Sequence, residues 1–243
     1  MMERQIRLMK NKVNYSLGEY NKSDLKEQWI RLTEGCPNNC PYCYEPTKIK
    51  IFKFPKIERN IVKIMDMNLI AKKEAISIIK KLGSLKVNNK VINYELICGV
   101  DFRFMTSEIA NELKKARFRN IRFAWDWGFK DQIKIVDTIK MFINAGYNQN
   151  KLMAFMICNW KIPFQENLRK LDLLKVWNVK VADCYFDNQT FPDVIPIHWT
   201  DNENKKFRKL CRKHNQLVSF KIDPEVKYST KTQRGKTNDN KQK

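Results

Sequence analysis

The chain lacks any stretch typical of a secretion signal or a membrane anchor. Residues 1–16 are charged and contain no apolar core of about 7 to 15 residues, and no run of about 18 apolar residues occurs anywhere. We therefore expect a cytoplasmic protein that does not contact a membrane. Its seven cysteines are not expected to form disulfides, because the cytosol keeps thiols reduced. Cysteines that lie close together in the sequence are then candidates for binding a metal.

Acidic side chains are scarce. The 243 residues include 26 Asp and Glu against 47 Lys and Arg, and the net charge is +21. Such an excess attracts polyanions, so RNA or another polyanionic substrate is an expected partner. The most basic stretches are 114–122 and 205–213. A compositional bias toward lysine explains the same excess without a function, and the sequence leaves both interpretations open.

Neither the histidines nor the isolated cysteines show the spacing of metal ligands. His198 and His214 lie outside the ends of the predicted strands, and we expect both at the surface. Four cysteines are scattered singly and are expected to be small buried hydrophobic residues: Cys98, Cys158, Cys184 and Cys211.

Short apolar runs alternate with amphipathic segments, an order typical of strand-helix units. We expect buried strands at 28–33, 61–66, 94–99, 121–126, 152–158 and 179–186. We expect helices at 71–82, 106–116, 130–145 and 164–176. Thr106 is expected to cap the second of these helices and Gly146 to end the third. The order predicts an α/β fold, a partial (β/α)6 TIM-like barrel with its chemistry at the carboxyl ends of the strands.

Polar or basic segments flank this core. Residues 1–24 are expected to form an N-terminal extension, and the core is expected to occupy residues 25–200. Residues 201–226 are expected to hold a C-terminal helix and a further extension, with the helix itself beginning at residue 200 and ending at residue 214. Residues 227–243 are basic and almost without apolar side chains, so they cannot offset their own ordering entropy and are expected to form a disordered tail.

The first predicted strand leads directly into a loop with the spacing CxxxCxxC, formed by Cys36, Cys40 and Cys43. Three thiolates can hold three irons of a 4Fe-4S cubane, which leaves the fourth iron open to a chelating amino acid. Gly35, directly before the first cysteine, permits the backbone to bend sharply where the strand ends.

This loop resembles the signature of the radical SAM superfamily, in which the residue before the third cysteine is aromatic, as Tyr42 is here. The resemblance implies a radical SAM type of partial barrel. It implies that the three cysteines bind a 4Fe-4S cluster, that S-adenosylmethionine chelates the free iron, and that the backbone near Tyr42 meets the adenine. It also implies a one-electron donor such as flavodoxin or ferredoxin, reductive cleavage of S-adenosylmethionine and abstraction of hydrogen from a substrate.

Polar residues at the ends of the next three strands extend the resemblance. Asp66 and Asn68 follow the second strand, where the family usually carries a GGE-type motif for the methionine amino group, so the chain departs from the common pattern as some branches do. Asp101 and Arg103 follow the third strand and Asp126 ends the fourth, as in phage-borne and cobalamin-linked radical SAM proteins. We expect Asp126 to accept hydrogen bonds from the ribose hydroxyls and Arg103 to pair with the methionine carboxylate or a substrate anion.

Each assignment has an alternative. Asp66 and Asn68 also fit a turn that binds no ligand, and Asp101 and Arg103 also fit a salt bridge to each other. The cysteine loop also fits a zinc site completed by a fourth cysteine or histidine. The alternative function is a non-catalytic iron-sulfur or zinc module that binds nucleic acid through its basic surface.

Overall fold

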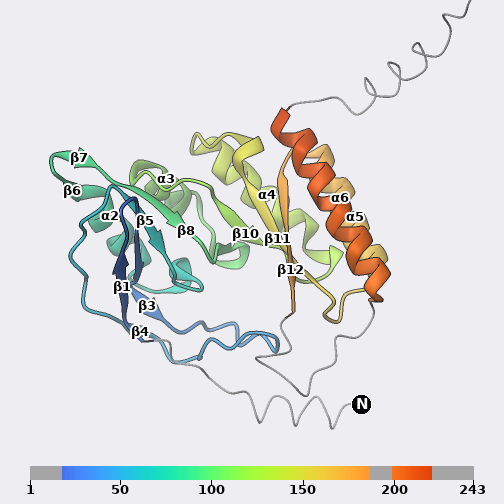
Figure 1. Ribbon diagram of the computed structural model, residues 1–243, viewed down its shortest axis with the longest axis horizontal. Helices are drawn as coiled ribbons and strands as arrows, with labels where there is room; N and C mark the ends of the chain where they lie inside the picture. The colour runs from blue at the N-terminus through green and yellow to red at the C-terminus, as the bar shows by residue number, and fades with distance from the viewer. Residues whose placement is uncertain (1–17, 187–198, 221–243) are drawn as a thin grey trace, which may run out of the picture.

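In the computed structural model, which describes residues 18–186 and 199–220, two four-stranded sheets lie side by side with helices packed against them (Figure 1). The first sheet has the order β1-β2-β5-β8 and the second the order β12-β11-β10-β9. The first contains β1 (Tyr20–Ser23), β2 (Gln28–Arg31), β5 (Ile61–Ile64) and β8 (Asn93–Leu96). The second contains β9 (Val100–Asp101), β10 (Arg122–Ala124), β11 (Met153–Cys158) and β12 (Lys180–Tyr185). Within these two sheets only β1 runs antiparallel to its neighbour.

Most strands and helices lie close to the ranges that the hydrophobic pattern predicts, but α2 begins at residue 75 instead of 71 and α6 continues to residue 220 instead of ending at 214. The α-helices are α2 (Ala75–Ser84), α3 (Ser107–Lys115), α4 (Gln132–Asn144), α5 (Phe164–Val176) and α6 (Asp201–Phe220), and the short 3-10 helices are η1 (Leu69–Ala71), η2 (Phe102–Phe104), η3 (Phe129–Asp131) and η4 (Gln149–Lys151). The hydroxyl of Thr106 caps α3 by accepting a hydrogen bond from the Ile109 N–H at 3.2 Å. Gly146 follows α4 with φ +89°, a conformation that suits glycine. Both predicted helix boundaries are therefore confirmed.

The third predicted strand, 94–99, is shorter than expected. It corresponds to β8, which ends at Leu96 in the first sheet, and after a turn the chain continues as β9 in the second sheet. Gly99 has φ +77° in this turn, and its N–H donates to the Leu96 carbonyl at 3.2 Å. The structure confirms an α/β fold with parallel sheets, and among the described residues these sheets do not close into a barrel.

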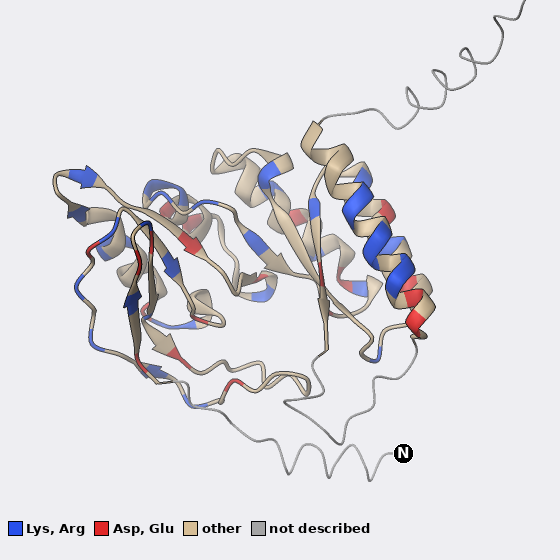
Figure 2. Ribbon diagram, viewed as in Figure 1, with Lys and Arg blue, Asp and Glu red and all other residues tan. Residues whose placement is uncertain are grey.

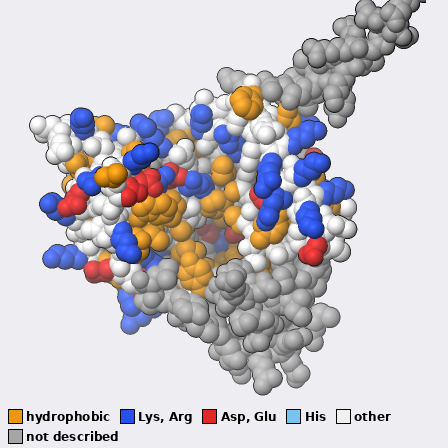
Figure 3. Space-filling model, viewed as in Figure 1, with side chains coloured by type: hydrophobic (Ala, Val, Ile, Leu, Met, Phe, Trp, Pro, Cys, Tyr) orange, Lys and Arg blue, Asp and Glu red, His pale blue; other side chains and the backbone are white. Residues whose placement is uncertain are grey.

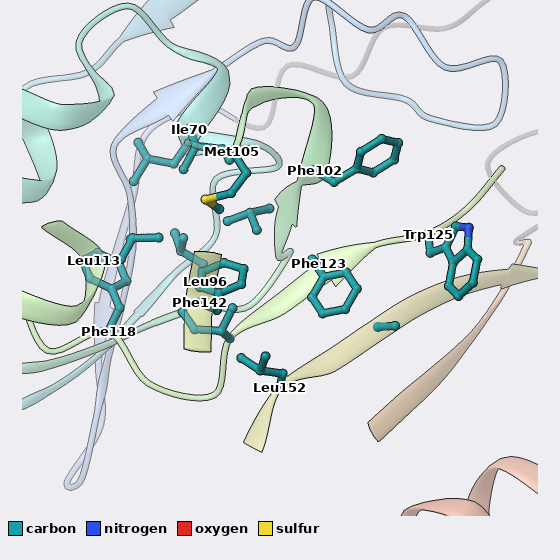
Figure 4. Packing of buried hydrophobic residues seen from close by; sticks show 14 of the residues in the cluster. Ile70, Leu96, Phe102, Met105, Leu113, Phe118, Phe123, Trp125, Phe142 and Leu152 are labelled. Carbon is teal, nitrogen blue, oxygen red and sulfur yellow. The ribbon is translucent and has the colours of Figure 1, made fainter. Parts of the chain in front are cut away.

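One hydrophobic core joins the two sheets. Leu96 on β8, Phe123 on β10, Phe142 on α4 and Leu152 before β11 belong to the same buried cluster (Figure 4). A continuous core of this kind makes the two sheets one packing unit.

The predicted N-terminal extension, residues 1–24, takes part in the first sheet, because β1 pairs with β2. Residues 1–17 lie outside the described residues, as do the predicted tail at 227–243 and residues 221–226 of the predicted C-terminal extension. None of the described helices is both long and apolar enough to cross a lipid bilayer.

The prediction that His214 lies at the surface is wrong. Its side chain is buried, and Nε2 lies 2.7 Å from the Val179 carbonyl oxygen. His214 shares a buried face of α6 with Phe207, Cys211 and Val218, so the ring packs in the interior. His198 lies outside the described residues.

Candidate functional site

The three cysteines of the CxxxCxxC motif lie on the loop between β3 (Thr33–Glu34) and β4 (Lys50–Ile51). The Cys36 N–H donates to the Pro46 carbonyl at 2.8 Å, and the Cys43 N–H donates to the Cys40 carbonyl at 3.0 Å. Gly35 has φ +93°, and a Cβ at this position would collide with the Lys48 carbonyl oxygen. The sharp bend that the sequence predicts before the first cysteine is therefore present and requires glycine.

A buried ion pair holds the base of this loop. Arg31 and Glu45 are each 2% exposed, and the Arg31 guanidinium donates to both Glu45 carboxylate oxygens at 2.9 and 2.8 Å. Glu45 also accepts a hydrogen bond from the Gly35 N–H at 2.7 Å. Glu45 therefore joins the start of the cysteine loop to β2.

A buried lysine joins the cysteine loop to the segment after β5. The Lys72 ammonium donates to the carbonyl oxygens of Gly35 and of Asn68, the latter at 3.1 Å. The Asn68 amide nitrogen lies 3.6 Å from Cys36 Sγ. Burial lowers the pKa of Lys72. Asn68, which the sequence predicts as a cofactor residue, is thus held beside the first cysteine.

Asp66 lies behind the site. It is fully buried, and its carboxylate accepts hydrogen bonds from the Leu32 N–H at 2.8 Å and the Thr33 hydroxyl at 2.6 Å. Burial raises its pKa to about 6. The carboxylate therefore holds the end of β2 and the start of β3.

A cavity of about 320 Å³ adjoins the cysteine loop. The carboxyl ends of strands from both sheets contribute to its walls, as the sequence predicts for the site. The predicted site residues that line it are Cys36, Cys40, Cys43, Tyr42, Asn68, Asp101, Arg103 and Asp126. Asp66 is not among the residues that line this cavity.

Tyr42 and Asp126, 84 positions apart, meet in the cavity wall. The Tyr42 hydroxyl donates to an Asp126 carboxylate oxygen at 2.9 Å. The Tyr42 ring centroid lies 5.4 Å from that of Trp127 and 5.8 Å from that of Trp160. Burial raises the pKa of Tyr42, and burial raises that of Asp126 to about 6. The phenol therefore stays protonated near neutral pH and orients the carboxylate.

Asp101 and Arg103 pair with each other at the cavity wall. Arg103 Nε donates to Asp101 Oδ1 at 2.9 Å, and the Arg103 backbone N–H donates to the same oxygen at 2.9 Å. The Asn38 amide donates to the other carboxylate oxygen. The salt bridge considered in the sequence analysis is present, and both of its members line the cavity.

Sequence reasoning did not place two of the isolated cysteines in the site. Cys98 and Cys184 line the cavity, whereas Cys158 and Cys211 are buried as predicted. Burial raises the pKa of Cys98 to about 11 and that of Cys184 to about 12, so both are thiols near neutral pH. Their positions at or near the ends of the third and sixth predicted strands carried the signal, because chemistry gathers at such ends.

The lining residues fit a 4Fe-4S cluster and S-adenosylmethionine. Three thiols converge on one cavity, and each can bind one iron. Asn68 is 4% exposed, and its Oδ1 has no hydrogen-bond partner among the described residues, so it can accept a hydrogen bond from an ammonium group. In the described part of the chain no three His, Cys, Asp or Glu side chains are grouped so that they could share one metal ion, and a 4Fe-4S cluster does not require this, because each thiolate binds a different iron.

No family model matches the chain, and no curated protein matches its sequence. Two solved structures of the radical SAM methyltransferase TsrM from Kitasatospora setae resemble the fold, one with cobalamin and a [4Fe-4S] cluster and one with tryptophan substrate and a SAM analogue. Each has a TM-score of 0.52 and 10% sequence identity. The chain has a radical SAM-like fold. Each match covers 65% of this chain and 36% or 35% of the TsrM chain, so this chain spans about a third of TsrM.

Proposed function

We propose that this chain is a radical SAM enzyme that binds a 4Fe-4S cluster through Cys36, Cys40 and Cys43. The observation that carries the proposal is the convergence of all three motif cysteines on one cavity, at the carboxyl ends of parallel strands. The fold likeness to a radical SAM methyltransferase supports it.

Three polar residues that line the cavity would each bind a different group of S-adenosylmethionine. Asn68 Oδ1 would accept from the methionine ammonium, Arg103 would pair with the carboxylate, and Asp126 would accept from the ribose hydroxyls. Tyr42 orients Asp126, and Asp66 supports the site from behind. When bound, the cluster would supply the electron for reductive cleavage of S-adenosylmethionine.

The apolar part of the lining excludes water from the same space. Phe155 and Ile157 on β11 and Phe186 after β12 line the cavity, and Tyr42 packs against the cluster that contains Ile157 and Phe186. Exclusion of water protects a reactive intermediate from side reactions. The substrate would enter between this wall and the bound cofactor.

The test is anaerobic reconstitution with iron and sulfide, followed by dithionite and S-adenosylmethionine. Formation of 5′-deoxyadenosine is expected even without substrate. Protein that binds stoichiometric zinc and no iron, and forms no 5′-deoxyadenosine, would instead support the non-catalytic nucleic-acid-binding module.

Asp126→Ala is expected to weaken S-adenosylmethionine binding on the order of tenfold or more, because a hydrogen bond to a charged acceptor contributes about 1.5–3 kcal/mol. Iron content is expected to be unchanged, since Asp126 is not a proposed ligand. Anaerobic titration calorimetry on reconstituted protein measures the affinity. Asp137→Ala, on the exposed face of α4, is the matched control. Equal affinity in both variants would remove Asp126 from the binding site.

We propose RNA or another polyanion as the substrate, bound by the basic face of α6. This face comprises Lys205, Lys206, Arg208, Lys209, Arg212 and Lys213, all exposed. Figures 2 and 3 show these charges gathered over α6. The Arg208 guanidinium lies 4.4 Å from the ring centroid of Tyr185, and Tyr185 lines the cavity. The basic face therefore reaches the cavity wall.

Two arginines of the other basic stretch, 114–122, have partners within the protein. Arg117 donates to the carbonyl oxygens of Ile92 and Gly83, at 3.0 and 2.7 Å. Arg122 pairs with Glu95. These guanidinium groups have structural partners, which leaves α6 as the better candidate surface.

Replacing Lys205, Lys209 and Lys213 by Gln is expected to reduce the salt dependence of RNA binding. Each phosphate that the protein no longer neutralises lowers the slope of log affinity against log salt by about 0.7 to 0.9. Filter binding of cellular RNA at several salt concentrations measures this slope. The control replaces the same number of exposed lysines elsewhere: Lys73 before α2, Lys80 on α2 and Lys134 on α4. If the substitutions on α6 leave the slope unchanged, the proposal of a polyanionic substrate fails, and small molecules and peptides become the candidate substrates.

A further inference from the structure

A short basic ribbon follows the cysteine loop. We use this name for residues 48–53, which read Lys-Ile-Lys-Ile-Phe-Lys. The ribbon contains β4, which pairs antiparallel with β3 through Thr33↔Ile51 and Glu34↔Lys50. Its three lysines are exposed, and its isoleucines, Ile49 and Ile51, are 42% and 49% exposed. The ribbon thus presents positive charge and apolar surface together.

Backbone contacts hold the basic ribbon against the proposed cluster site. The Pro46 carbonyl, two residues before the ribbon, accepts a hydrogen bond from the Cys36 N–H at 2.8 Å. The backbone of Lys48 lies so close to Gly35 that no side chain fits between them. On its other side, the Phe52 N–H donates to the Leu32 carbonyl at 2.9 Å. The ribbon is therefore a preformed surface next to a proposed iron ligand.

The lysines of the basic ribbon differ in their partners. Lys50 lies 3.3 Å from the buried carboxylate of Glu34. In the described part of the chain, no carboxylate forms an ion pair with Lys48 or Lys53. Two ammonium groups of the ribbon are thus available to an external acidic group.

We propose that the basic ribbon is the docking surface for a small acidic protein that carries one electron, such as a flavodoxin. The proposal rests on the proposed function, because a redox-active cluster needs an electron donor. Transfer of one electron would convert the carrier's flavin hydroquinone to the semiquinone and reduce the cluster from the 2+ to the 1+ state. Encounters between redox proteins bury little area and depend on complementary charge, which suits a short ribbon of lysine and isoleucine.

The position of the basic ribbon separates electron delivery from substrate binding. The cofactor and substrate would occupy the cavity, whereas the ribbon lies outside the cysteine loop. The helix α6, whose outer side carries the basic face, packs against β12 of the second sheet, whereas β4 pairs with β3 in a separate two-stranded sheet (Figure 2). A carrier on the ribbon would therefore not compete with a polyanion on α6.

The test compares two double charge reversals in the full chain carrying the reconstituted cluster. Lys48→Glu with Lys53→Glu changes the ribbon and leaves Lys50 with Glu34. Lys73→Glu with Lys134→Glu makes the same change of net charge at exposed positions on other surfaces. Binding of an acidic bacterial flavodoxin is measured by anaerobic calorimetry, and cluster reduction by the reduced flavodoxin is followed by stopped-flow absorbance and EPR.

The ribbon variant is expected to bind flavodoxin on the order of tenfold more weakly at low salt, with a smaller difference at high salt. The control variant is expected to match the wild type. Equal loss in both variants, or no loss in either, would overturn the proposal. Dithionite, which needs no docking surface, is expected to reduce the cluster in all three proteins. No reduction by dithionite would instead count against the proposed function itself.

Discussion

Replacing any one of Cys36, Cys40 and Cys43 by alanine is expected to abolish the iron-sulfur absorption and the EPR signal of the reconstituted protein. Each of the three thiolates would bind a different iron, and the fourth iron would have no protein ligand. Removing one thiolate would therefore leave a second iron without a protein ligand. The measurement is iron and sulfide content together with the absorption spectrum and the EPR spectrum of the dithionite-reduced sample. The loss is expected to be nearly complete for each single variant.

The control is the same substitution at each of the isolated cysteines: Cys98, Cys158, Cys184 and Cys211. Cys98 and Cys184 are the most stringent controls, because they line the same cavity as the motif cysteines. All four variants are expected to retain the cluster. A full cluster in Cys40→Ala, or its loss in Cys98→Ala or Cys184→Ala, would contradict the assignment of the ligands.

Much of the fold was predictable because local patterns determine it. The α5 boundaries, Phe164–Val176, coincide with the expected helix, since an apolar face at helical spacing marks it clearly. That local pattern does not predict which of the two sheets each strand joins. The turn at Gly99 ends one expected strand early and leads the chain from the first sheet into the second, and β1, which belongs to the expected extension, pairs with β2. Both features depend on tertiary packing.

The sequence contains a pattern that predicts the burial of His214, although we expected this residue at the surface. Phe207, Cys211, His214 and Val218 recur at helical spacing, so the 3.6-residue period places the histidine on the buried face. The surface prediction rested instead on the histidine's position outside the ends of the predicted strands and on the absence of ligand-like spacing. The Val179 carbonyl pairs with the buried ring nitrogen, which offsets the cost of burial.

The candidate site was predictable at the level of strand ends and not at the level of contacts. Asn68 follows β5 of the first sheet and Asp126 follows β10 of the second, and both residues line the cavity of the cysteines, as expected of residues at carboxyl ends of parallel strands. The pairing of Tyr42 with Asp126 joins residues 84 positions apart, and no local pattern encodes it. The same holds for Glu45, whose role beneath the loop follows only from the position of Arg31.

Glu45→Ala is expected to lower the free energy of unfolding by about 3–5 kcal/mol, because it removes the carboxylate that pairs most closely with the buried Arg31 and leaves only Glu34, at 4.0 Å. Arg31 is 2% exposed, and its NH1 nitrogen already has no hydrogen-bond partner among the described residues. The Gly35 N–H would lose its acceptor as well, which frees the start of the cysteine loop. Urea unfolding of the protein without its cluster measures the change at neutral pH.

The matched control for this change is Glu58→Ala, which removes an exposed carboxylate 3.4 Å from Lys56. Such surface pairs contribute about 0–1 kcal/mol, so the control is expected to unfold close to the wild type. Glu45→Gln keeps an acceptor for the Gly35 N–H and removes only the charge, so its stability is expected to lie between the two. Equal unfolding midpoints for Glu45→Ala and Glu58→Ala would show that the buried pair does not hold the loop. Reduced iron content in Glu45→Ala, with every cysteine intact, would show that the same pair supports the cluster site.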